Sequence, residues 1–157
     1  MIVGDEPALV PELSVTDLAA SLRFWRDLCG FTVEYERPEE GFAYLSLATA
    51  HVMLDQIGTG RDWITGPLVP PLGRGINLQL AVADLAPILA RLAAAGYPLF
   101  RPPETRWYRI GAEAAGVEQF LVTDPDGYLL RFQRPSGRRA AGPSGSGWPL
   151  PDPPRLP

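Results

Sequence analysis

The chain has 157 residues, of which 46% are hydrophobic and 20% charged; this is the composition of an ordinary globular domain and excludes a fibrous or largely disordered protein. Its 18 acidic and 14 basic side chains give a formal net charge of −4, so a surface that follows nucleic acid phosphates is not expected. Cys29 is the only cysteine, which excludes an intrachain disulfide and a cysteine-rich zinc site.

The N-terminal residues show no basic segment followed by a long apolar stretch, as a secretory signal would. No later segment approaches the roughly 18 consecutive apolar residues that a membrane span needs. We therefore expect a soluble, cytoplasmic protein without a membrane partner.

An internal repeat organises the chain. The segment Leu13-Ser-Val15-Thr-Asp17-Leu18 returns 67 residues later as Leu80-Ala-Val82-Ala-Asp84-Leu85. In each copy an alternating stretch ends at an aspartate, whose side chain can accept hydrogen bonds from the free amides of a helix start. Apolar residues then recur at helical spacing up to Gly30 or Gly96, which ends the helix.

Three extended stretches follow the helix in the first copy, at residues 31–35, 41–47 and 51–56. The second copy continues with 97–100, 118–122 and 128–132, and Asp124-Pro-Asp-Gly127 forms a turn between the last two. Each copy therefore predicts a βαβββ module. The fold class is α+β, with two tandem modules forming a mixed, curved sheet whose one side is covered by helices.

These patterns define one domain over residues 1–134. Module one covers 7–57, the Gly- and Pro-rich stretch 58–75 is a linker loop, and module two covers 76–134. Residues 136–157 are dominated by Gly, Pro, Ser and Arg, a composition that buries little apolar surface, so we expect a disordered tail.

Strand alternation divides the side chains of the strands between two faces. The apolar set is expected to pack under the helices: Leu13, Val15, Leu78, Leu80, Val82, Leu130 and Phe132. The alternate set is polar where a core would be apolar, and it predicts a groove for a ligand. This set comprises Val10, Glu12, Ser14, Asn77, Gln79, Leu129, Arg131 and Gln133. The alternative is a solvated surface on which Glu12 and Arg131 pair.

Aromatic residues on loops strengthen the groove interpretation, because exposed rings usually cover something. Trp63 lies in the linker loop, and Trp107 and Tyr108 lie in a stretch expected at the mouth of the groove. Phe42 and Tyr44 add aromatic surface at the edge of the first sheet. Core packing is the alternative for each ring.

The paired modules, the V-x-D-L helix starts, the segment Phe24-Trp25-Arg-Asp-Leu28-Cys-Gly30-Phe31 and the turn Asp124-Pro-Asp-Gly127 resemble the vicinal oxygen chelate, or glyoxalase/bleomycin resistance, superfamily. The resemblance covers residues 7–134 and is closest to the bleomycin resistance proteins. It implies the fold, which is shared by several enzymes and by antibiotic-binding proteins, and does not by itself fix the activity.

Metal-binding members of that superfamily hold one divalent ion between the two modules. The resemblance places the ligand positions at Val10, Asn77 and Arg131, with the fourth near Leu54. Val10 has no donor atom and a guanidinium has no free lone pair. We therefore expect no metal and no other cofactor. The single histidine, His51, is interpreted as a strand-end or surface residue, and Cys29 as a core residue.

The resemblance implies that a homodimer binds a cationic, planar antibiotic of the bleomycin type and sequesters it without altering it, which confers resistance. Carboxylates at Glu12, Asp62 and Glu118 would complement the cation. The alternative is a metal-dependent lyase, transferase or dioxygenase with a displaced site that uses His51, Asp55 or Glu118; a sensing or assembly role is a third option. The predicted ligand-binding residues are Glu12, Phe42, Tyr44, Trp63, Asn77, Gln79, Trp107, Tyr108, Glu118, Phe120 and Arg131.

The N-terminal segment is expected to support the dimer. Pro7 and Pro11 disfavour a continuous strand ladder. The resemblance implies that residues 1–10 cross to the partner subunit, which would place residues of both chains in each cleft.

Overall fold

The computed structural model describes residues 7–61 and 63–142, and these residues form the two predicted βαβββ modules. No helix in this part of the chain is long and apolar enough to cross a bilayer. Module one contains β1 (Glu12–Val15), α1 (Leu18–Leu22), the π-helix η1 (Arg23–Leu28), β2 (Thr32–Arg37), the 3-10 helix η2 (Pro38–Glu40), β3 (Phe42–Leu47) and β4 (Ala50–Gln56). Module two contains β5 (Asn77–Ala81), α2 (Ala86–Ala94), β6 (Arg101–Ile110), β7 (Glu113–Thr123) and β8 (Leu129–Ala140).

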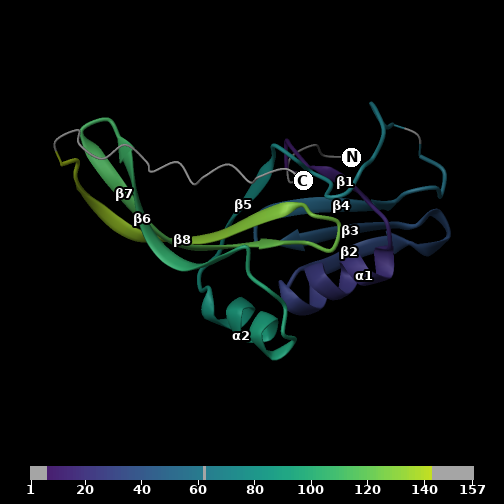
Figure 1. Ribbon diagram of the computed structural model, residues 1–157, viewed down its shortest axis with the longest axis horizontal. Coiled ribbons are helices and arrows are strands. Elements are labelled where there is room, and N and C mark those ends of the chain that lie inside the picture. The colour runs from purple at the N-terminus through teal and green to yellow at the C-terminus, as the bar shows by residue number, and fades with distance from the viewer. Residues whose placement is uncertain (1–6, 62, 143–157) are drawn as a thin grey trace, which may run out of the picture.

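The two sheets have the same topology. Sheet A has the order β1-β4-β3-β2 and sheet B the order β5-β8-β7-β6. In each, the first strand is parallel to the last strand of its module and the other pairs are antiparallel. Both helices lie on one side of the strands, below them in Figure 1, and this leaves the opposite sheet faces uncovered by helices.

The helix starts follow the repeat, with one difference. The Asp17 side chain accepts a hydrogen bond from the Ala20 amide at 3.0 Å and caps α1, as predicted. Asp84 accepts from the Ala86 amide at 3.0 Å, but α2 begins at Ala86, one residue later than predicted, with Leu85 at the cap position and Pro87 in its first turn. Gly30 and Gly96 have φ values of +85° and +62°, which confirms them as left-handed helix ends.

The core lies between the helices and the sheets. The side chains predicted to pack under the helices are all buried or partly buried against it. Cys29 is also fully buried, and burial raises the pKa of its thiol, as befits a core residue. Phe24, which helical spacing did not place inside, is buried next to Trp25 because η1 is a π-helix, and its wider turn brings both rings to the core.

The turn between β7 and β8 connects the modules. The Asp126 carboxylate accepts hydrogen bonds from the Thr16 hydroxyl at 2.6 Å and from the Thr16 amide at 3.1 and 3.2 Å. The Tyr128 hydroxyl donates to the Ser14 carbonyl at 3.0 Å. The predicted turn is therefore present and also anchors the end of β1.

Strands β6, β7 and β8 are longer than predicted and extend beyond α2, to the left in Figure 1. Residues 97–100 are not a strand; β6 begins at Arg101. The expectation of disorder from residue 136 is wrong for 136–140, because this segment continues β8 and pairs with the first residues of β7. Residues 143–157 lie outside the described part of the chain.

The linker is a loop, as predicted: its described residues, between Gln56 and Asn77, form no helix or strand. It is nevertheless attached to the β7–β8 turn. Leu72 is buried in the core, and its amide donates to the Asp126 carbonyl at 2.7 Å. The linker therefore runs past the β7–β8 turn on its way to β5.

Candidate functional site

The face of sheet A that the helices leave uncovered carries polar and aromatic side chains. Ala43, Leu45, Val52 and Leu54 point to the core, so the residues that alternate with them point away from it. We call this surface the open face of sheet A. Its residues are Glu12, Ser14, Tyr35, Arg37, Phe42, Tyr44, His51, Met53 and Asp55.

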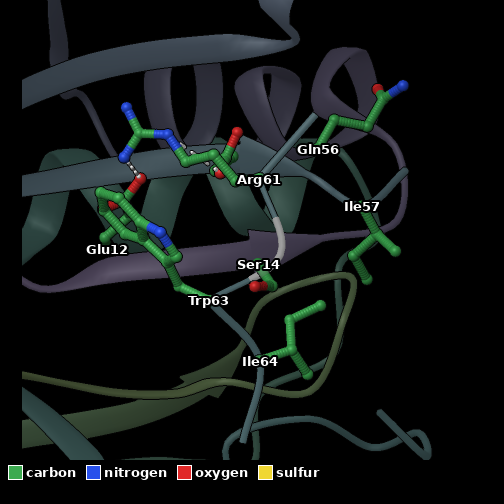
Figure 2. A pocket seen from close by; sticks show the side chains of 8 residues that line it. Glu12, Ser14, Gln56, Ile57, Arg61, Trp63 and Ile64 are labelled. Atoms are coloured by element: carbon green, nitrogen blue, oxygen red, sulfur yellow. Dashed lines mark hydrogen bonds and ion pairs between the residues drawn. The ribbon is translucent and has the colours of Figure 1, made fainter. Parts of the chain in front are cut away.

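One end of this face forms a charged pocket of about 240 Å³. Arg61, from the linker, reaches over the sheet: its Nη1 lies 2.5 Å from Glu12 Oε1 and its Nε 3.6 Å from Asp55 Oδ2. Figure 2 shows Trp63 beside this ion pair and Ile64 further along the linker. The pocket thus combines two carboxylates with aromatic and aliphatic surface.

The other end of the face forms an aromatic pocket of about 420 Å³. The rings of Tyr35 and Tyr44 stack with centroids 5.1 Å apart and planes 13° from parallel, and His51 contacts Tyr44 edge-on at 5.6 Å. Glu34 and Met53 complete the inner wall, and the N-terminal residues Pro7 and Val10 form the rim. The Nδ1 atom of His51 is buried without a hydrogen-bond partner.

The corresponding face of sheet B carries a second group of predicted residues. Asn77 and Gln79 are exposed on β5, and Arg131 on β8 donates to Gln79. The Arg131 guanidinium lies 5.9 Å from the Tyr108 ring on β6. The structure therefore brings the predicted residues together as two groups, one on each sheet, rather than in one groove.

Within the first group, Glu12 and Trp63 line the charged pocket and Tyr44 lines the aromatic one. Phe42 lies on the same face but is 1% exposed, because the guanidinium of Arg37 covers its ring at 3.9 Å. Asp62 lies outside the described residues.

Three predicted ligand contacts lie elsewhere. Phe120 is 0% exposed and stacks on Phe132 in the core, so its prediction as a ligand contact is wrong: its cross-strand partner is a helix-facing residue. Glu118 forms an ion pair with Arg134 at 2.8 Å and lines a depression beside α2. Trp107 packs on Gly116, on the same face of sheet B as Phe120, which is the face that the helices cover. Its neighbour Tyr108 points to the opposite, open face.

The sequence analysis missed Tyr35 and Arg61 as site residues. The alternation of β4 could have placed His51 and Asp55 on the open face, because these residues alternate with Val52 and Leu54, which point to the core. Nothing in the sequence placed Arg61 over β1, because that contact joins residues 49 positions apart.

The family model described as the Glyoxalase/Bleomycin resistance protein/Dioxygenase superfamily matches residues 9–132. The chain belongs to this superfamily. A superfamily member from Vibrio splendidus is 38% identical over 79% of this chain and 94% of its own, with a TM-score of 0.37. No curated protein matches the chain significantly.

Two further solved structures share the superfamily fold at lower identity. TioX from Micromonospora sp. ML1 is 23% identical, covers 82% of this chain and 98% of its own, and has a TM-score of 0.62. A virulence protein from Salmonella typhimurium is 18% identical, covers 85% and 98%, and has a TM-score of 0.61. These likenesses concern the fold alone.

The register of the strands corrects one metal-ligand position that the resemblance implied. Gln79 pairs with Arg131 in module two, and its counterpart Glu12 pairs with Met53 in module one, so Met53 and not Leu54 corresponds to Arg131. Leu54 points into the core. No group of three or more His, Cys, Asp or Glu side chains that could hold a metal ion occurs within residues 7–61 and 63–142.

The donor set at the four superfamily positions does not fit a divalent ion. Val10 has no donor, Met53 offers a soft thioether, and Arg131 is a permanent cation. Asn77 alone supplies an oxygen. We therefore derive no chemistry from a metal at these positions.

Proposed function

We propose that this protein binds a flat, cationic small molecule on the open face of sheet A and sequesters it without covalent change. An antibiotic of the bleomycin type is the candidate that the resemblance suggests, and resistance would follow from removal of the free drug. The observation that carries the proposal is the row of aromatic side chains Phe42, Tyr35 and Tyr44, which lies beside carboxylates on this face.

The aromatic row is partly open to a ligand. Tyr35 is 50% exposed, although its ring stacks with Tyr44 at 5.1 Å and with Phe42 at 6.0 Å. The exposed parts of these rings offer apolar contact surface for a planar heterocycle. His51 and Met53, at the inner wall, add polarisable contacts that adapt to an irregular ligand.

The carboxylates that line the two pockets favour a cation. Glu12 and Asp55 line the charged pocket together with Arg61, and Glu34 lines the aromatic pocket; Arg37, on the same face, pairs with Glu40. Carboxylates next to ring faces attract flat cations through both charge and the ring quadrupole.

A metal-dependent enzyme has less support. His51 and Asp55, two of the residues that a displaced site would use, line different pockets at opposite ends of β4. Glu118, the third, lies on sheet B in an ion pair with Arg134. The binding proposal needs no such convergence.

We propose further that the functional unit is a twofold homodimer in the cytoplasm, with the N-terminal segment contributing to the partner. Pro7 and Val10 line the aromatic pocket, so the first described residues of the chain reach the proposed binding surface, which supports this assembly. The apolar side chains of Ile110 on β6 and Ile76 before β5, both about half exposed, provide surface for a partner.

The test is a titration of the protein with metal-free and with copper-loaded bleomycin, read by tryptophan fluorescence, because Trp63 borders the charged pocket. We expect saturable quenching at micromolar drug and recovery of unmodified drug after denaturation. No saturable change at these concentrations would contradict the proposal, and a chemically altered drug would favour an enzyme.

A further inference from the structure

The position of Arg61 is unusual for a linker residue. It belongs to no strand, yet its guanidinium contacts carboxylates on two strands, Glu12 of β1 at 2.5 Å and Asp55 of β4 at 3.6 Å. Figure 2 shows these contacts as the arginine side chain lying across the pocket. The charged pocket is therefore partly filled by the protein's own cation.

Aromatic rings complete the surroundings of this guanidinium. Its central carbon lies 4.9 Å from the Trp63 ring centroid and 5.4 Å from that of Phe42, both within the range of a cation–π contact. Two carboxylates and two rings form the set of partners that recognises a flat, delocalised cation. Arg61 thus has the chemistry of a ligand group held in a binding site.

This occupant can leave without disrupting a sheet. Arg61 lies in a stretch without helix or strand, and the Cβ positions of Gly58 and Gly60 just before it face open space. Trp63 is 79% exposed, so it does not fasten this part of the linker to the core. The Arg61 and Glu12 side chains remain 33% and 25% exposed, so water and a ligand's cation can reach this ion pair.

We propose that Arg61 is an internal substitute for the ligand's cationic group. The charged pocket takes a guanidinium, an amidinium or a similar flat cation of the ligand, which displaces Arg61 from Glu12 and Asp55. This inference rests on the proposed function and adds which end of the open face receives the charge, and what occupies that end in the free protein.

The test compares the affinity of wild type and Arg61→Ala for benzamidinium, a ring that carries an amidinium, by calorimetry. If Arg61 fills the pocket about nine-tenths of the time, its removal tightens binding about tenfold. The matched control is Arg74→Ala, which removes a cation from the same linker: the Arg74 guanidinium donates to the Pro70 carbonyl instead of the pocket carboxylates. We expect this control to change affinity less than about twofold.

A second variant locates the cation. Adding Glu12→Gln and Asp55→Asn to Arg61→Ala should abolish the gain, because the neutral pocket no longer attracts an amidinium. Thermal unfolding of each variant shows that it is folded. Equal or weaker binding by Arg61→Ala overturns the inference.

The two proposals fail in different ways. If bleomycin binds wild type and Arg61→Ala with equal affinity, the open face binds cations but Arg61 is no substitute for them. If neither protein binds bleomycin or benzamidinium, the proposed function itself is wrong, and the inference falls with it.

Discussion

The indole nitrogen of Trp25 donates a hydrogen bond to the Asp124 carboxylate across 3.2 Å. Trp25 lies in η1 of module one and Asp124 begins the turn between β7 and β8, so the bond joins the modules through a buried contact. Trp25→Phe keeps an aromatic ring but removes the donor, and the smaller ring leaves a gap. We expect the free energy of unfolding in urea to fall by about 2–4 kcal/mol.

The control for this prediction is Trp107→Phe, in a ring that is 36% exposed on β6. Its effect should stay within about 0.5 kcal/mol, as for most accessible positions. Equal losses in the two variants would show that the bond to Asp124 adds nothing.

The same carboxylate predicts a pH dependence of stability. Burial raises the pKa of Asp124 to about 6, although hydrogen bonds from Tyr128 and Trp25 oppose the shift. The folded state therefore binds this proton more tightly than the unfolded state, in which an aspartate titrates near pH 4. The contribution of Asp124 to stability is full below about pH 4 and is lost as the pH rises through about 6.

Asp124→Asn isolates this contribution from other titrating groups. The free energy of unfolding of wild type minus that of the variant should decrease between about pH 4 and pH 7. Urea unfolding at several pH values measures the difference. A difference that does not change with pH would contradict the shift.

The attachment of the linker gives a prediction about Gly73. This residue has a φ of +72°, and a Cβ there would lie 2.4 Å from the Tyr128 ring. Gly75 has a similar φ of +85° with open space around it. Gly75→Ala should therefore cost about 1–2 kcal/mol for the left-handed backbone alone, and Gly73→Ala distinctly more.

The measurement is urea unfolding of both variants. The excess loss at Gly73 reports the packing of the linker on Tyr128, whose hydroxyl holds β1 through Ser14. Equal losses would mean that the linker moves aside at no cost.

The aromatic row predicts how substitutions at Tyr35 affect binding. Tyr35→Ala removes a half-exposed ring from this row and should weaken the binding of bleomycin about fivefold, since an aromatic contact contributes about 1 kcal/mol. Tyr35→Phe preserves the ring and should bind like wild type. Fluorescence titration compares the three proteins, and weak binding by the Phe variant would assign the role to the hydroxyl instead of the ring.

Deleting residues 1–8 removes Pro7 from the rim of the aromatic pocket along with the segment before it. If this segment crosses to the partner subunit, the deletion should weaken self-association and drug binding together. Sedimentation velocity and the drug titration measure the two effects. A monomer that binds bleomycin with full affinity would rule out a cleft shared between subunits.

Much of the fold could be predicted because the repeat around Asp17 and Asp84 marks the same local physics twice: an alternating strand, a capped helix and a glycine stop. The errors come from tertiary pairing. Trp107 was expected at the mouth of the groove among the loop aromatics, but it lies on β6, an edge strand that tolerates Pro102 and Pro103.

The site could be predicted only in part for the same reason. The composition of residues 136–140 predicted disorder, but these residues continue β8 and are stabilised by pairing with β7. Phe120 was assigned to the ligand although its partner Phe132 was correctly assigned to the core, because cross-strand register is not visible in a single segment. Arg61 reaches the site through a loop, where periodicity carries no information.

The matched positions of the two modules differ in charge. Glu12 on sheet A corresponds to Gln79 on sheet B, so a carboxylate matches a neutral amide. Met53 on sheet A corresponds to Arg131 on sheet B, so an apolar side chain matches a guanidinium. At these four positions, two molecules that meet with the open faces of their A sheets opposed gain no pair of opposite charges, and Glu12 keeps its ion pair with Arg61. Meeting A face to B face brings Glu12 toward Arg131. The two modules thus share a backbone topology but differ in surface charge. In the proposed homodimer, this difference favours the approach of the open face of sheet A to the open face of sheet B of the other copy.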